Sequence, residues 1–156
     1  MKKINFGILL ILSAFLYAGL SLAGEPKEVF ERQHFVIYHN DKIFANDISW
    51  KAEGHYKSII MHLGVQSFRP WEGKEKCPIY LFDTRDDYIK YTGAPVWSAG
   101  IAQMKPLRLA IFKGAPDLKT TTLPHEITHL VLFKFFEKEP PLWLTEGLAQ
   151  FEEETA

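Results

Sequence analysis

Hydrophobic and polar positions in the first half of the chain follow two different spacings. The segment HFVIYH, residues 34–39, is rich in β-branched and aromatic side chains, which predicts a strand. Over residues 43–63, apolar side chains recur three or four positions apart, which is helical spacing. Asn40 or Asp41 can cap this helix, and Gly64 is suited to end it. We therefore expect the domain to open with a strand followed by a long helix.

A polar loop separates this helix from the next strand-like segment. CPIYLFD, residues 77–83, predicts a second strand, and residues 84–92 predict a short helix. Asp83 or Thr84 can serve as its N-cap, and Gly93 is suited to close it. Two more strands are predicted at residues 98–104 and 107–112, and they turn at Lys105-Pro106.

Two helices are predicted at the end of the chain. Residues 121–138 form a strong helix candidate, which Thr121 or Thr122 can cap, and Pro124 fits its first turn. The Pro140-Pro141 pair is expected to stop this helix, and a last helix follows at residues 142–154. The whole order of elements predicts an α+β domain with a small sheet.

The N-terminal segment differs from the rest of the chain. A pair of lysines precedes an apolar run at residues 8–22, and small residues follow with the spacing that signal peptidase requires. This pattern predicts a signal peptide, residues 1–23, cleaved after Ala23, and a secreted or periplasmic mature protein. Because the run is also close to spanning length, an uncleaved membrane anchor is the alternative. Residues 24–156 are then expected to form a single domain.

Composition narrows the possible partners. The chain has 156 residues, of which 47% are hydrophobic and 24% charged, and this suits one globular domain. The formal net charge is -1, so the chain has no basic surplus with which to bind nucleic acid. Cys77 is the single cysteine, so no internal disulfide is possible, and we expect it to be a buried small hydrophobe.

One segment carries candidate chemistry. TLPHEITHLVLF, residues 122–133, contains two histidines four positions apart, with a glutamate after the first. On a helix, His125 and His129 share one face and can bind one zinc ion. Glu126 points in another direction, where it can take a proton from a water that the metal activates. A zinc-free structural protein with a chance motif is the alternative.

A catalytic zinc site needs a third protein ligand and keeps a fourth position open. The metzincin pattern is excluded because Leu132 and Phe135 stand where it requires glycine and histidine. The segment PPLWLTEGLAQF, residues 140–151, places Glu146 on the following helix. Since the Pro-Pro stop allows this helix to fold back, Glu146 is the expected third ligand.

Together, LPHEITHL and PLWLTEGLA resemble the gluzincin zinc metallopeptidases, and most closely the bacterial peptidase MA-like group. The resemblance covers residues 34–152 loosely and the two motifs closely. It implies a zincin-like fold, in which a small mixed sheet carries an HExxH helix followed by a glutamate-bearing helix. It also implies that zinc is bound by His125, His129 and Glu146, and that Glu126 is the general base.

The resemblance implies a metallopeptidase that hydrolyses a peptide or protein substrate. Because no residue is identifiable as an anchor for a substrate N-terminus, endopeptidase action is favoured. Family members continue beyond the glutamate-bearing helix, so this chain is expected to be C-terminally short. No residue matches the histidine or tyrosine that stabilises the transition state in related enzymes. The second hypothesis is therefore a non-catalytic zinc-binding domain with a degenerate or truncated peptidase fold.

Several other residues are predicted to have structural roles. Gly147 is expected to allow close packing of the last two helices, and Trp143 is expected to lie in the core. The strand at residues 107–112 is expected to form the edge of the substrate cleft. A solvated helix end is predicted for Glu152, Glu153 and Glu154. Purely structural roles are predicted for the remaining histidines, His34, His39, His55 and His62.

Overall fold

The computed structural model describes residues 24–138 and 140–156, and the fold is mixed α+β. The predicted signal peptide, residues 1–23, lies outside the described residues. Among the helices that are described, none combines the length and the apolar character needed to cross a membrane. The α+β class predicted from the order of elements is confirmed.

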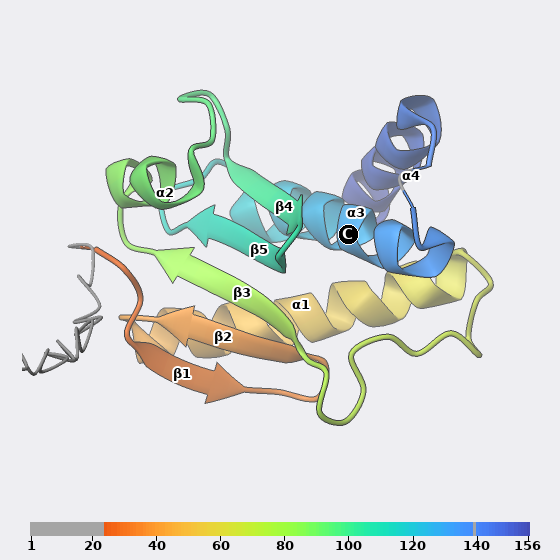
Figure 1. The fold of residues 1–156 in the computed structure, drawn as a ribbon, viewed down its shortest axis with the longest axis horizontal. Coiled ribbons are helices and arrows are strands. Elements are labelled where there is room, and N and C mark those ends of the chain that lie inside the picture. Colours follow the sequence, from red (N-terminus) through yellow and green to blue (C-terminus); the bar gives the residue numbers. More distant parts are fainter. Residues whose placement is uncertain (1–23, 139) are drawn as a thin grey trace, which may run out of the picture.

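Five strands form one sheet with the order β1-β2-β3-β5-β4. The central strands β2, β3 and β5 run parallel to one another, and an antiparallel strand lies at each edge. Figure 1 shows this mixed sheet with β1 and β4 at its two edges. The strands span β1 Glu28–Glu31, β2 Phe35–His39, β3 Cys77–Phe82, β4 Gly100–Met104 and β5 Leu107–Phe112.

Two helices pack on the same face of the sheet, and the last helix packs on one of them rather than on the sheet. In Figure 1, α1 and α3 both run behind the strands, while α2 lies at one end and α4 packs on α3. The helices span α1 Lys42–His62, α2 Arg85–Thr92, α3 Leu123–Phe136 and α4 Leu142–Thr155. Helix α3 contacts β4, β5, α1 and α4, so it links the sheet to both of the other long helices.

The core lies between the sheet and the pair α1 and α3. Alternate residues of the strands point into it, as the two-residue period of a strand requires. From the helices, apolar residues spaced three or four apart supply the opposite wall. Fully buried members include Phe35, Ile37, Ile79, Leu109, Ile111, Ile48, Ile59, Ile127, Leu130 and Val131. This burial anchors one face of α3 and leaves its other face to α4 and β4.

The predicted caps of the first two helices are confirmed. Asp41 accepts hydrogen bonds from the backbone N–H groups of Ile43 and Phe44 at the start of α1. Thr84 caps α2 by accepting from the Asp87 N–H, and Gly93 ends α2 with a φ of 69°. A glycine fits this left-handed conformation because it has no Cβ.

The predicted limits of the motif helix are wrong at both ends. A π-helical turn, η1 Leu118–Thr122, leads directly into α3, so backbone carbonyls take the place of a threonine cap. The Leu123 N–H bonds to the Leu118 carbonyl, and Thr122 makes no side-chain cap bond. At the other end, Glu137 adopts a φ of 57° and ends α3 before the Pro-Pro pair is reached.

Two features of the sheet differ from the sequence prediction. Strand β1 was not predicted, because its four residues include two glutamates and none is buried. Strand β5 was expected at the edge of a cleft, but it lies inside the sheet between β3 and β4. The edge strand beside the motif helix is β4, because the hairpin formed by β4 and β5 places β4 on the outside of β5.

Candidate metal centre

Helix α3 places two imidazoles on one face, one turn apart. His125 and His129 are both half-buried, and their Nε2 atoms lie 3.0 Å apart. The opposite face of α3 carries Ile127, Leu130 and Val131, which are fully buried in the core. Core packing therefore fixes the rotation of α3 and turns both imidazoles toward α4.

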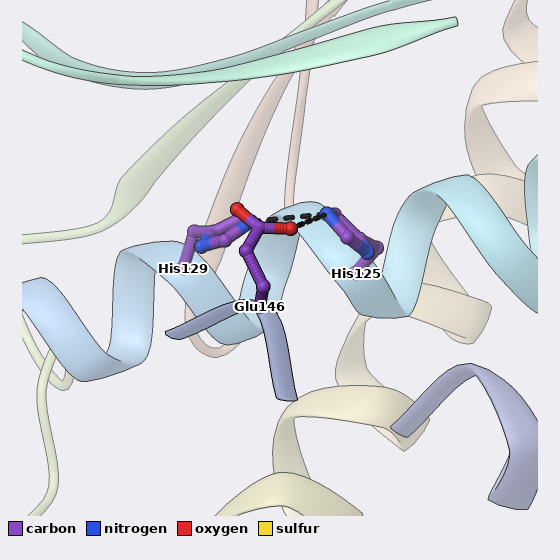
Figure 2. A group of neighbouring side chains, drawn as sticks. All are labelled: His125, His129 and Glu146. Atoms are coloured by element: carbon purple, nitrogen blue, oxygen red, sulfur yellow. Dashed lines mark hydrogen bonds and ion pairs between the residues drawn. The ribbon is translucent and has the colours of Figure 1, made fainter. Parts of the chain in front are cut away.

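Helix α4 brings Glu146 to these imidazoles. Its carboxylate oxygens lie 3.7 Å from His125 Nε2 and 3.6 Å from His129 Nε2. Figure 2 shows the carboxylate of Glu146 reaching up between the two rings from a separate helix. Over residues 24–138 and 140–156, these three form the one His, Cys, Asp or Glu group close enough to hold a metal ion.

The three side chains fit a zinc ion. Zinc bonds of about 2.0–2.2 Å in a tetrahedral arrangement place neighbouring ligand atoms roughly 3.3–3.5 Å apart. The observed separations of 3.0, 3.6 and 3.7 Å bracket that value. Burial, together with the nearby His125, holds the pKa of His129 below its usual value, which favours the neutral imidazole that a metal requires.

A second carboxylate supports His125 from behind. His125 Nδ1 lies 2.5 Å from Glu153 Oε1. If Nδ1 carries the proton and donates it to this carboxylate, the lone pair of Nε2 is left facing His129 and Glu146. Outer carboxylates of this kind orient metal-binding histidines and raise their basicity. Glu153 is thus a candidate site residue whose contact with His125 the sequence did not predict, because a solvated helix end was the expected role of Glu153.

The neighbouring glutamate ties α4 to α1. Glu152 is only 4% exposed, and its carboxylate lies 3.0 Å from His62 Nδ1 at the end of α1. The prediction of a solvated Glu152 is therefore wrong, whereas Glu154 is exposed as expected. Adjacent residues Glu152 and Glu153 thus join α4 to α1 and to α3 respectively.

Glu126 occupies a different position from the three candidate ligands. Its Oε2 accepts a hydrogen bond of 2.6 Å from the backbone N–H of Ala102 on β4. Desolvation raises the pKa of the Glu126 carboxyl to about 7, against the opposing effects of His125 and of the Ala102 N–H. A carboxyl of this kind beside a metal site is suited to accept and return a proton.

Gly100 allows β4 to approach α3 this closely. A Cβ at this position would lie 2.7 Å from Thr122 Cγ2, at the entry to α3, and 3.3 Å from Glu126 Cγ on α3. The start of β4 is also anchored by Ser98, whose hydroxyl bonds to Tyr88 and to the Gly100 carbonyl. The glycine and this anchor together hold β4 where Ala102 meets Glu126.

Two expectations for α4 are wrong. A Cβ on Gly147 would meet nothing within 4 Å, so this glycine is not required for close helix packing. Trp143 is 75% exposed and does not lie in the core. Both residues fall on the outer side of α4, because its inner side is occupied by Glu146, Ala149 and Glu153.

Among the described residues, the other histidines lie away from this cluster. His34 Nδ1 lies 2.6 Å from Glu53, and His55 Nε2 lies 2.7 Å from the Lys119 carbonyl. His39 is buried at the end of β2. Cys77 is also buried as predicted, and its burial raises the pKa of the thiol.

Comparison with known proteins adds no further assignment. No family model, no curated protein and no solved structure matches this chain.

Proposed function

We propose that this chain is a zinc-dependent metallopeptidase of the gluzincin type, with a zincin-like fold of the peptidase MA-like kind. The convergence of His125, His129 and Glu146 is the observation that carries the proposal. The consecutive helices α3 and α4 bring these side chains together, and Glu126 lies beside them. The antiparallel edge strand β4 next to α3 adds support, because an extended peptide can pair with such an edge.

Each residue has a distinct role in this proposal. His125, His129 and Glu146 hold the metal, while Glu153 orients His125. Zinc bound there would supply Lewis acidity and would activate a water for attack on the scissile carbonyl. Glu126 accepts the proton of the attacking water and passes it to the leaving amine.

Substitution of the base and of a ligand separates these roles. Glu126→Gln is expected to keep zinc bound and to abolish cleavage, whereas His129→Ala is expected to lose both. Glu154→Gln, an exposed position on the same helix as Glu146, is the matched control and should retain both properties. Peptidase activity retained in pure, metal-loaded Glu126→Gln protein would contradict the mechanism.

A non-catalytic zinc-binding domain is the second candidate, and one observation favours it. Among the described residues, the two cavities that border the site are lined by no tyrosine, arginine or further histidine able to stabilise an oxyanion. Turnover of a broad peptide mixture by the zinc-loaded chain would exclude this candidate. Metal analysis also tests the choice of zinc, because two histidines and a carboxylate can bind iron(II) as well.

The location of the protein belongs to the same proposal. The export signal predicted at residues 1–23 would put the activity in the periplasm or outside the cell, or on the membrane if the segment is not cleaved. Endopeptidase action is proposed because the sequence offers no identifiable anchor for a substrate N-terminus. Products released from an internally labelled peptide blocked at both termini would test this mode of cleavage.

A further inference from the structure

An apolar pocket adjoins one side of the candidate metal centre. This cavity, of about 380 Å³, is lined by Met104 from β4, Phe133 from α3 and Leu142 from α4. His129 and Glu146 form its wall toward the metal centre. Phe133 follows His129 by four positions, so both side chains lie on the same face of α3.

A larger cavity extends the pocket along the edge strand. It has a volume of about 740 Å³, shares Met104 and Phe133 with the pocket, and reaches Ala102 and Lys105. The two cavities together form a groove between β4 and α3. Figure 1 shows how the strand β4 and the helix α3 lie relative to each other. Because this groove follows an edge strand, an extended polypeptide can lie along it by strand addition.

The backbone of β4 is oriented to bind such a chain. Ala102 donates its N–H to Glu126 on α3, so its backbone polar groups face the outer edge of the sheet. Backbone groups alternate in direction along a strand, so those of Met104 face the same edge. An extended polypeptide beside β4 can therefore bond to Met104 while one of its side chains enters the pocket.

Leu142 points to the chemistry of that side chain. It is 73% exposed in the first turn of α4, at the mouth of a pocket whose other apolar walls are Met104 and Phe133. Covering these three groups with an apolar side chain removes apolar surface from water. An acidic side chain would instead lose its hydration there and face the carboxylate of Glu146 in the pocket wall.

We propose that Met104, Phe133 and Leu142 form a specificity pocket that selects a bulky apolar side chain of an extended polypeptide. The selected residue lies next to the scissile bond, on its His129 side. The cleavage part of this inference rests on the proposed peptidase function. The choice of side chain concerns binding, so it can be measured without turnover.

Photo-crosslinking to the full chain carrying Glu126→Gln, incubated with zinc, tests the pocket. The probe is an alanine peptide with one central p-benzoylphenylalanine, and mass spectrometry locates the crosslinks. They are expected at Met104, Phe133 or Leu142, and a competing peptide with central leucine should suppress them about tenfold better than one with central aspartate. Crosslinks centred on Trp97, or labelling that does not saturate as the probe concentration rises, would overturn the assignment of the pocket. Equal suppression by the leucine and aspartate peptides would also overturn it.

Two exposed neighbours provide a matched pair of variants. Leu142→Asp is expected to remove most of the preference for leucine over aspartate, because it places a charge at the mouth of the pocket. Trp143→Asp should leave the preference intact, since Trp143 is equally exposed but does not line the pocket. A similar loss in both variants would contradict the assignment of the pocket.

Failure of the pocket and failure of the peptidase give different results. Selective crosslinking in the pocket, with no cleavage by the unsubstituted zinc-loaded chain, would support the pocket and overturn the peptidase. Cleavage of peptides with no preference for an apolar residue beside the cut would overturn the pocket alone.

Discussion

His125 Nδ1 and Glu153 Oε1 lie 2.5 Å apart, so a glutamate seven residues beyond Glu146 holds the first histidine of the HEITH motif. The same helix therefore supplies both a candidate ligand and the group that orients another ligand. With the proton on Nδ1 and shared with Glu153, Nε2 of His125 would be free to bind a metal. Positioning of α4 is consequently as important to the site as the motif itself.

Removal of Glu153 should weaken metal binding. Glu153→Ala is expected to lower zinc affinity by about 10- to 100-fold, because His125 loses its orienting partner. Competition with a chromophoric chelator measures the affinity directly. Glu154→Ala, its exposed neighbour, is the control and should bind zinc normally. An unchanged affinity in Glu153→Ala would show that the hydrogen bond has no role in the site.

A side chain at Gly100 should destabilise the fold. Gly100→Ala places a methyl group 2.7 Å from Thr122 Cγ2, so β4 or α3 must move, and we expect a loss of about 1–3 kcal/mol of unfolding free energy. Gly54→Ala is the control: it lies in α1 with open space around its Cβ, and should be neutral or stabilising by up to about 1 kcal/mol. Urea denaturation of both variants checks these signs, and equal stabilities would refute the close approach.

The contact between His62 and Glu152 should stabilise the docking of α4. Glu152→Ala is expected to lower the free energy of unfolding by about 1–3 kcal/mol, because it removes a buried carboxylate and its contact with His62. Hydrogen exchange of the α4 amides should accelerate in the same variant. In a double-mutant cycle with His62→Ala, the two losses should not add. If the two losses of unfolding free energy add fully, the contact between His62 and Glu152 does not stabilise the protein.

The thiol of Cys77 should be unreactive in the folded protein. Cys77 is buried in β3, and burial raises the pKa of its thiol, so little thiolate exists at neutral pH. A thiol reagent should therefore modify one group per chain in denaturant and almost none in native buffer. Rapid modification of the native chain would contradict the burial of this strand.

Most of the fold was predictable from local patterns in the sequence. The helix capped by Asp41 and the strand that begins at Cys77 have long periodic segments and recognisable ends. The motif helix was found, but its start was not, because the π-helical turn before Leu123 gives no side-chain signal. Strand β1 was missed because it is short and charged, and its pairing with β2 decides its structure.

The candidate site was predictable only as far as its motif residues. The convergence of Glu146 with the histidines was expected, and the structure brings the three together. The roles of Glu152 and Glu153 were not, because each depends on a contact with a residue far away in sequence. The rotation of α4 about its axis decides these contacts, and it also explains why Trp143 and Gly147 face outward.

Metal content is the most direct test of the central claim. Mass spectrometry of the purified chain, of Glu146→Ala and of the control Glu154→Ala gives the stoichiometry and the identity of the metal. We predict about one zinc per chain in the unsubstituted protein and in the control, and much less in Glu146→Ala. Absence of zinc from the unsubstituted chain, or full zinc content in Glu146→Ala, would contradict the three-ligand site and the peptidase that depends on it.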